Sequence, residues 1–509
     1  MTVFAASHLF GPFEEARIPY RVTGTDAPRP IPPGCGAIWI DGQELGRRWY
    51  WPRAEEFAWE EAGPSAYRLE EIHLVGHVVS ERAARALLRG DGTGWEPDGA
   101  IVTSPGGRPA GSILRTADGS LFLPFDPAEC VTNLRSERYR EIGRPALRSR
   151  ARSGAVRAYY AIRPLLPRRV QLALRRAVAQ RQRPPEFPRW PAETSLHDLT
   201  DLLLELTATF AGSPVPSIDV WPNGHRWAVV LTHDVEARAG YEDLGLLRQP
   251  EREAGLRSSW NFVPLRVPKH ERYEVSESVL GMLADEGCEV GVHGLHHDGR
   301  DLESLTMLRE RLPAIRMFAD RWGAVGFRAP ATQRAWAWMP LLGFDYDTSS
   351  PDSDPYEPIR GGCCSWLPFF NDAMVELPIT LPQDHTLFSI LGHRDGLVWI
   401  DKLHMIRERG GMALVLSHPD YARDPVLHEA YRALLALAAA DEGAWHALPR
   451  EVSDWWRRRA DSRLEATETG WVIRGPASED AHVRWLDADP GPAARSPARG
   501  DGRREVVGP

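Results

Sequence analysis

Cysteine and lysine are both scarce in this sequence. The 509 residues include five cysteines, which are too few for a disulfide framework and lack the paired spacing of a structural zinc site. Cys363 and Cys364 are adjacent, and we interpret them as two loop thiols, with a redox pair as the alternative. Lysine occurs only at Lys269 and Lys402 among 61 basic residues, and the net charge is −9. This charge balance argues against a nucleic-acid-binding protein.

Long apolar runs are also missing. No stretch reaches the roughly 18 consecutive apolar residues that a membrane span requires. The opening residues, MTVFAASHLFGPFEE, lack the basic start and apolar run of a secretory signal, so we expect a cytoplasmic protein. Apolar residues make up 43% and charged residues 26% of the chain, which is ordinary globular composition. That composition excludes a wholly disordered, collagen-like or coiled-coil chain.

The chain divides into four expected regions. Residues 1–133 mix short apolar runs with Gly and Pro turns and predict an accessory α/β domain. Residues 134–192 predict an Arg-rich helical segment and a Pro-rich linker. Residues 193–460 predict the catalytic domain. Residues 461–509 predict a terminal hairpin between GWVIRGP and AHVRWLD, followed by a disordered tail.

The Arg-rich segment carries a strong local charge. Residues 135–189 contain 16 Arg and three acidic residues, and the pattern over 167–183 predicts a basic amphipathic helix. One interpretation is peripheral contact with an anionic membrane at its inner face. The alternative is that this segment packs against the acidic remainder of the chain.

Strands and helices alternate from residue 227 onward. Helical patterns such as 276–287 and 301–322 lie between the strands. This alternation predicts a parallel sheet, and seven strands in about 220 residues favour a barrel over an open sheet. The expected strands are 227–234, 258–263, 288–293, 324–328, 344–348, 373–378 and 411–417.

The first of these strands ends abruptly in polar residues. The apolar run WAVVLT is followed by His233, Asp234 and, after one further residue, Glu236. Side chains alternate along a strand, so Asp234 and Glu236 point to the same face. Barrel enzymes keep their active sites at the carboxyl ends of the strands. The alternative interpretation of Asp234 is a helix N-cap.

The third strand ends in a cluster of histidines. His293, His296, His297 and Asp298 follow the apolar run CEVGV. His293 and His297 are four residues apart, so one helical turn or a tight loop would bring both rings together. Two His and one carboxylate would leave a position open for water, as catalytic zinc requires. A lone His is more often structural, but three within five residues favour a metal site.

Other strands of the series end in the same manner. Arg328 follows the fourth strand, and alternation places Asp345 and Asp347 on one face of the fifth. His418 ends the last apolar strand. One polar loop is unremarkable, but charged or polar residues at strand after strand indicate an active site.

These segments together resemble a known family. Residues 220–455 resemble the polysaccharide deacetylase, or NodB-like, family of carbohydrate esterases. The resemblance implies an α/β protein with a distorted (β/α)7-type barrel and metal-dependent removal of an acetyl group from an N-acetylated sugar. The five matching motifs are LTHDVE (231–236), HGLHH (293–297), FRAP (327–330), DYDTS (345–349) and LVLSH (414–418).

The resemblance assigns catalytic roles to individual residues. Asp234 resembles the catalytic base, and His418 resembles the general acid. Arg328 resembles the arginine that lines the groove and holds the base, and Asp347 resembles the acid that tunes the catalytic histidine. Leu416 resembles the wall of the acetyl pocket.

A further segment resembles a subgroup of the family. ELPITLPQDHTLF is similar to bacterial members associated with surface-glycan synthesis. Within it we expect Asp384 and His385 to contact the substrate.

The metal set departs from the family pattern at one position. The usual motif has two adjacent Asp, whereas here Val235 follows Asp234. The sequence resembles the acid-x-acid version of the motif, with Glu236 as a metal ligand beside His293 and His297. The resemblance implies one divalent metal, zinc by default, with manganese, nickel or cobalt as alternatives.

The sequence therefore predicts a metal-dependent N-deacetylase for a surface polysaccharide or lipid-linked sugar. One alternative is a related amidase that hydrolyses a small non-sugar amide without metal. Another is a catalytically silent glycan-binding protein. The deacetylase hypothesis requires Asp234, Glu236, His293 and His297 to converge within about 5 Å, with His296 turned away. The motifs carry no signal for an oligomeric state.

Overall fold

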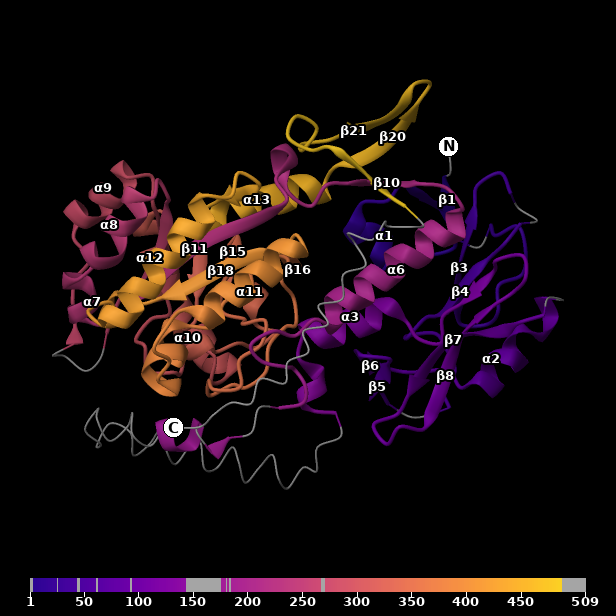
Figure 1. Cartoon of the computed structure of the whole chain (residues 1–509), viewed down its shortest axis with the longest axis horizontal. Coiled ribbons are helices and arrows are strands. Elements are labelled where there is room, and N and C mark those ends of the chain that lie inside the picture. Colours follow the sequence, from indigo (N-terminus) through magenta and orange to yellow (C-terminus); the bar gives the residue numbers. More distant parts are fainter. Residues whose placement is uncertain are drawn as a thin grey trace.

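The computed structural model contains two large sheets joined by one long helix (Figure 1). It describes residues 3–24, 26–43, 46–60, 63–91, 94–142, 175–179, 181–182, 185–266 and 271–487. The expected tail at 489–509 and most of the expected basic helix at 167–183 lie outside the described residues. Among the residues that are described, no helix combines the length and the apolar character needed to cross a membrane.

The N-terminal part of the chain forms the first sheet. Its described strands number nine and run in the order β2-β1-β3-β4-β9-β8-β7-β5-β6. The strands are β1 (Phe4–Ala6), β2 (Tyr20–Val22), β3 (Cys35–Ile40), β4 (Trp49–Pro52), β5 (Ser65–Leu69), β6 (Ile72–Gly76), β7 (Glu96–Thr103), β8 (Pro109–Arg115) and β9 (Leu121–Phe122). The helices are α1 (Gly11–Ala16), α2 (Glu81–Leu87) and α3 (Pro127–Arg135), with 3-10 turns η1 (Leu88–Asp91) and η2 (Arg138–Arg140).

Helix α6 (Ser195–Ala211) packs on this first sheet (Figure 1). Leu199 and Leu203 belong to the same buried core as the strands, and the ring of Phe210 lies 5.8 Å from that of Trp49 in β4. The helix ends at Gly212, whose positive φ of 66° suits glycine. The expected domain boundary at residue 193 therefore passes through one hydrophobic core.

The second sheet contains all seven strands that the sequence predicts. Its order is β16-β17-β15-β14-β13-β12-β11-β18, and β19 also pairs with β11. The seven predicted strands are β11 (Trp227–Val235), β12 (Ser258–Phe262), β13 (Glu289–His293), β14 (Gly326–Arg328), β15 (Tyr346–Asp347), β17 (Met374–Glu376) and β18 (Met412–Ser417). The short strands beside them are β16 (Phe369–Asn371), antiparallel to β17, and β19 (Ala444–His446).

Helices pack around this sheet. Side chains of Ser276, Ser304 and Asp424 accept backbone N–H groups at the starts of α9, α10 and α12, as N-cap residues do. The helices are α7 (Arg238–Glu242), α8 (Gly245–Glu253), α9 (Glu277–Asp285), α10 (Leu305–Trp322), α11 (Leu397–Glu408), α12 (Pro425–Ala439) and α13 (Pro449–Ala460). The 3-10 turns are η4 (Pro222–Gly224), η6 (Pro330–Thr332), η7 (Met339–Leu342) and η9 (Pro419–Tyr421), and η8 (His385–Leu391) is a π-helix.

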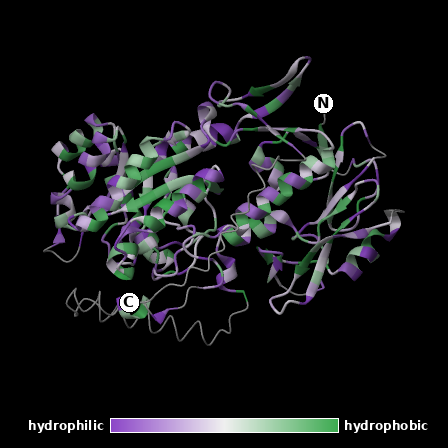
Figure 2. Ribbon diagram, in the orientation of Figure 1, coloured by the Kyte–Doolittle hydropathy of each residue, from purple (hydrophilic) through white to green (hydrophobic). Residues whose placement is uncertain are grey.

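The alternation of side chains along β11 defines an inner and an outer face of the sheet. Val229 and Leu231 join the outer core, which includes residues of α8, α11 and α12, whereas Ala228 and Val230 join an inner core. Figure 2 shows the central strands as mainly hydrophobic, as burial on both faces requires. By the same alternation, Asp234 continues the inner face.

The two ends of the sheet path approach each other. Thr380 Oγ1 donates to the carbonyl of Met412 (2.7 Å) and accepts the N–H of Leu414 (2.8 Å). The N–H of Leu381 donates to the carbonyl of Leu414 at 3.1 Å. Because these residues follow β17 and bind β18, the sheet is curled. The predicted α/β class and parallel sheet are confirmed, while the closed seven-stranded barrel stays a prediction.

The expected terminal hairpin is wrong in its pairing. GWVIR, as β21 (Gly470–Arg474), pairs antiparallel with β20 (Arg463–Thr467) across a two-residue loop. The later strand, β22 (Val483–Leu486), pairs instead with β10 (Val215–Ile218). The short loop explains the difference, because local pairing carries the smaller loop-closure entropy.

Two arginines of the basic segment contact the chain itself. Arg175 Nη2 lies 3.4 Å from the Glu357 carboxylate, and Arg176 Nε donates to the carbonyl of Ser389 at 2.7 Å. These two residues thus pack against the protein, and contact of the basic segment with a membrane stays a prediction.

The vicinal cysteines are fully buried and free. Burial raises the pKa of the Cys363 and Cys364 thiols above the ordinary value. Because the thiolate is the reactive form, this environment opposes a redox role.

Candidate active site

The predicted site residues gather at the carboxyl edge of the second sheet. Asp234 lies near the end of β11, and Glu236 follows that strand directly. His293 ends β13, Arg328 ends β14, and His418 follows β18. These strands are parallel neighbours, so their carboxyl ends meet on one edge.

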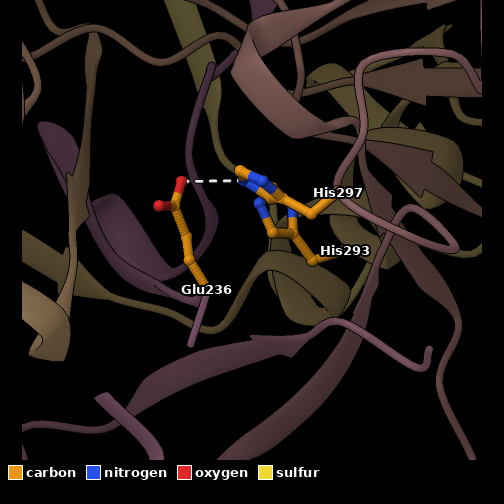
Figure 3. A group of neighbouring side chains, drawn as sticks. All are labelled: Glu236, His293 and His297. Atoms are coloured by element: carbon orange, nitrogen blue, oxygen red, sulfur yellow. Dashed lines mark hydrogen bonds and ion pairs between the residues drawn. The ribbon is translucent and has the colours of Figure 1, made fainter. Parts of the chain in front are cut away.

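Three side chains form a group that could hold a metal ion. The ligand atoms of Glu236, His293 and His297 all lie within 4.8 Å of one another. Figure 3 shows Glu236 facing both rings, with Oε1 2.9 Å from Nε2 of His297. Burial raises the pKa of Glu236, but His297, His418 and His293 together outweigh burial and hold this pKa well below the usual range. His296 is turned away, as predicted, with Nδ1 2.8 Å from the carbonyl of Leu265.

A tight turn after β13 brings the two histidines together. Gly294 and His297 both have positive φ, 60° and 55°. A Cβ at Gly294 would collide with Pro330 and Asp301, so this position requires glycine. The ring centroids of His293 and His297 are consequently 5.1 Å apart.

The protonation state of His293 suits metal binding. Its Nδ1 lies 3.1 Å from the carbonyl of Arg328, so Nδ1–H donates and Nε2 keeps its lone pair. Nε2 is buried and finds no hydrogen-bond partner among the described residues. Burial lowers the pKa of His293 to about 4, which leaves the ring neutral near pH 7. A neutral imidazole oriented by a bond to its other nitrogen is the usual metal-binding form, so these donors fit a divalent cation.

Asp234 is held ionised beside this group. Its Oδ1 accepts Nδ2 of Asn261 at 3.0 Å and lies 3.4 Å from Nη1 of Arg328. Its Oδ2 lies 3.7 Å from Nε2 of His293. Burial raises the pKa of Asp234, but the Arg328 guanidinium and its other neighbours outweigh burial and hold the value below the ordinary one.

Arg328 is fully buried and fixed by two threonines. Nε donates to Oγ1 of Thr348, and Nη2 donates to Oγ1 of Thr232, both at 2.9 Å. The remaining nitrogen of the guanidinium, Nη1, faces Asp234. Arg328 therefore lies next to Asp234, the predicted base, as expected.

His418 carries a carboxylate partner on the far side of its ring. Nδ1 lies 2.6 Å from Oδ1 of Asp384, and the backbone N–H of His418 donates to Oδ2 at 2.7 Å. Burial lowers the pKa of His418, but Asp384 outweighs it and raises this pKa to about 10. Nε2 lies 3.8 Å from Oε1 of Glu236, so the imidazolium presents its second N–H to the site.

The expected pairing of Asp347 with His418 is wrong. The Asp347 carboxylate accepts the N–H and the hydroxyl of Ser349, at 2.7 and 2.6 Å. Tyr346 belongs to the inner core and Thr348 binds Arg328, so both neighbours face the site. Alternation directs Asp347 to the opposite face of the sheet.

The predicted substrate contact at Asp384 is also wrong. This side chain is fully buried, and besides His418 it accepts the backbone N–H of His385 at 2.6 Å. Its oxygens are therefore occupied by the protein. The ring of His385 stacks on Tyr421 at 5.0 Å, and its Nε2 lies 3.0 Å from Nη1 of Arg175. Contact between His385 and a substrate stays a prediction.

Leu416 lies on the inner face of β18. It is opposite Thr232 in the register of β11 and belongs to the inner core. Its exposed fraction is 1%. It lies on the same face as Asp234, and its role as the wall of an acetyl pocket stays a prediction.

Sequence reasoning missed the partner of the base, Asn261. Residue Asn261 is directly opposite Asp234 in the parallel pairing of β11 and β12. Both strands were predicted, but aligning their expected carboxyl ends would have placed Asp234 opposite Val263, so the observed register was needed to find this pair.

A second missed group lies behind the site on the outer face. His233 contacts Oγ of Ser417 at 3.0 Å and Oε1 of Glu251 at 2.6 Å. Tyr431 donates to the same carboxylate at 2.5 Å. All four side chains are buried, and the group ties the strands that carry Asp234 and His418. It explains why a polar His233 occurs within an apolar strand.

Comparison with known proteins gives structural likenesses only. No family model matches the chain, and no curated protein matches it. A protein described as a polysaccharide deacetylase from Mycobacterium smegmatis is 20% identical, with a TM-score of 0.38, over 49% of this chain and 97% of its own. Another from Pseudomonas aeruginosa PAO1 is 17% identical, with a TM-score of 0.37, over 47% and 93%. Puue allantoinase is 16% identical, with a TM-score of 0.36, over 47% and 92%.

The chain is thus similar over about half its length to solved structures described as polysaccharide deacetylases. Each of these TM-scores is below 0.5.

Proposed function

We propose that this protein is a metal-dependent hydrolase that removes N-acetyl groups from a sugar or glycan intermediate. The observation that carries the proposal is the buried group of Glu236, His293 and His297, with an ionised Asp234 and a protonated His418 beside it. A base and an acid placed around one group of metal-binding donors are what amide hydrolysis requires.

Glu236, His293 and His297 would hold the metal. A bound divalent cation would polarise the acetyl carbonyl and lower the pKa of the attacking water. Asp234 accepts the proton from that water as the new bond to carbon forms. Asn261 and Arg328 both bind Oδ1 of Asp234, which fixes the carboxylate and leaves Oδ2 for the proton.

His418 supplies the proton that the departing nitrogen needs. An amine expelled as its anion is a very poor leaving group, so an acid must protonate it as the carbon–nitrogen bond breaks. Nε2–H of His418 faces the site, while Asp384 holds Nδ1 and stabilises the imidazolium. The protonated state of His418 therefore fits the general-acid role.

We further propose that the curled sheet is a distorted (β/α)7-type barrel, with the first sheet as its accessory domain. We expect a cytoplasmic protein that acts on a surface-polysaccharide or lipid-linked intermediate. The metal-free amidase is the second candidate. The buried Nε2 of His293, which has no hydrogen-bond partner among the described residues, favours the metal enzyme because a metal ion would occupy its lone pair.

The test is acetate release from N-acetylated chito-oligosaccharides by the full-length protein. Activity should disappear after treatment with a chelator and return with zinc. Glu236→Ala should lose both bound zinc and activity. Glu242→Ala is the matched control, because Glu242 is an exposed carboxylate on the adjacent helix and pairs with Arg238. Acetate release that survives the chelator would refute the metal mechanism.

A further inference from the structure

One carboxylate outside the predicted set holds the loop that carries Glu236. Asp420 lies in η9, two residues after His418. Its Oδ2 accepts the backbone N–H of Glu236 at 3.0 Å, and its Oδ1 accepts the N–H groups of Ala237 and Gly240 at 3.1 and 3.3 Å. Three backbone donors thus converge on one side chain, and all three belong to the segment that begins at the expected metal ligand.

Neighbouring residues allow Asp420 to approach this loop closely and hold the loop from the other side. A Cβ at Gly240 would collide with the Asp420 carboxylate, so the absence of a side chain permits the close approach. On the opposite side, the hydroxyl of Tyr273 donates to the carbonyl of Val235 at 2.5 Å. The backbone around Glu236 is therefore held from two directions.

We propose that Asp420 is a positioning residue for the metal ligand Glu236, an inference that rests on the proposed metal site. Strand β11 ends at Val235, so the strand ladder does not fix the residue that follows it. Asp420 supplies the missing acceptor at the N–H of Glu236. A group that orients a metal ligand reduces the conformational freedom that the ligand loses when the metal binds. Loss of such a group therefore weakens metal affinity.

Asp420 also links Glu236 to the general acid. His418 and Asp420 are two residues apart, and Nε2 of His418 lies 3.8 Å from Oε1 of Glu236. The carboxylate therefore sets the position of Glu236 relative to both the metal-binding histidines and His418.

Two variants of the full chain test this role by different routes. Asp420→Asn keeps the shape but replaces one acceptor oxygen with an NH2 group that faces backbone N–H donors. Gly240→Ala leaves Asp420 intact and forces it away from the loop. Asp424→Asn is the control, because Asp424 also accepts a backbone N–H, that of Val426 at 2.9 Å, but caps α12. Asn is an equally good cap, so this change should be neutral.

Zinc affinity is measured by calorimetry on chelator-treated protein whose fold is checked by circular dichroism. Asp420→Asn and Gly240→Ala should weaken zinc binding about 10- to 100-fold, the usual effect of losing a group that orients a ligand, and Asp424→Asn should not. Hydrogen exchange in the metal-free proteins should show faster exchange at the amides of Glu236 and Ala237 in both variants.

The outcomes separate this inference from the proposed function. Equal zinc affinities in the wild type, Asp420→Asn and Gly240→Ala would overturn the positioning role while leaving the metal site intact. Unchanged exchange at Glu236 and Ala237 in the variants would overturn it as well. A wild-type chain that takes up no zinc would overturn the metal site, and the role of Asp420 with it.

Discussion

The pairing of His418 with Asp384 can be tested by removing one charge. Asp384→Asn preserves the size of the side chain but removes the carboxylate 2.6 Å from Nδ1 of His418. Asp384 is fully buried, so water cannot replace the lost interaction readily. The variant should therefore lower the pKa of His418 without creating a cavity in the core.

The structure sets the direction and size of the change. Asp384 counters the effect of burial and raises the pKa of His418 to about 10. The acid form is present below this pKa and is lost as the pH rises through it. A hydrogen bond to a charged group contributes about 1.5–3 kcal/mol, and about 1.36 kcal/mol corresponds to one pKa unit. Asp384→Asn should therefore move the alkaline loss of activity about 1 to 2 pH units lower.

The assay is kcat/KM for acetate release between pH 5 and pH 10, with zinc content measured at each pH. Between pH 5 and pH 7 the two proteins should show the same pH dependence, because the pKa of Asp234 lies below its ordinary value and Asp234 is not bonded to Asp384. An alkaline limb at the same pH in the wild type and in Asp384→Asn would refute the reasoning. Loss of zinc in parallel with activity would also refute it, since His418 and Asp384 are not ligands in our assignment.

Three further predictions test other parts of the molecule. His418→Ala should keep its zinc and lose activity by a factor of about 10² to 10⁴ in kcat, and equal loss of both would make His418 a ligand. Lys402→Ala should lower the free energy of unfolding in urea by about 3–5 kcal/mol, because Nζ contacts both oxygens of the buried Asp352 at 2.9 and 2.7 Å. Flotation with anionic vesicles should show no binding even at low salt, because Arg175 and Arg176 contact the protein itself. Binding at low salt that fades at high salt would support the membrane alternative.

The strands and the candidate metal-binding residues were predictable because they leave strong local signals. Strands β11, β13 and β18 are mainly apolar runs, and each of these runs stops where a polar residue faces the site. Alternation along β11 correctly placed Asp234 and Glu236 on one side. The four-residue spacing of His293 and His297 indicated a tight approach without specifying the turn that achieves it.

The partner of His418 was not predictable in the same manner. Asp347 lies in β15, which spans only two residues, so there is no apolar alternation to show which face it takes. Asp384 lies outside any strand, at the start of η8, and reaches His418 through the fold of the segment that follows β17. Such a contact depends on tertiary packing, which the alternation of side chains along a strand cannot predict.

The departure from two adjacent acids is explained by the geometry around Glu236. A second acid directly after Asp234 would take the position of Val235, which belongs to the outer core, so the next residue on the site's face is two positions on. That position lies beyond the end of β11, farther along the strand axis than an adjacent residue would be. The extra methylene of Glu compensates for this, since Oε1 lies 2.9 Å from Nε2 of His297. A longer side chain on a residue outside the ladder has more freedom to lose on metal binding, and this is why a carboxylate such as Asp420 should matter at this site.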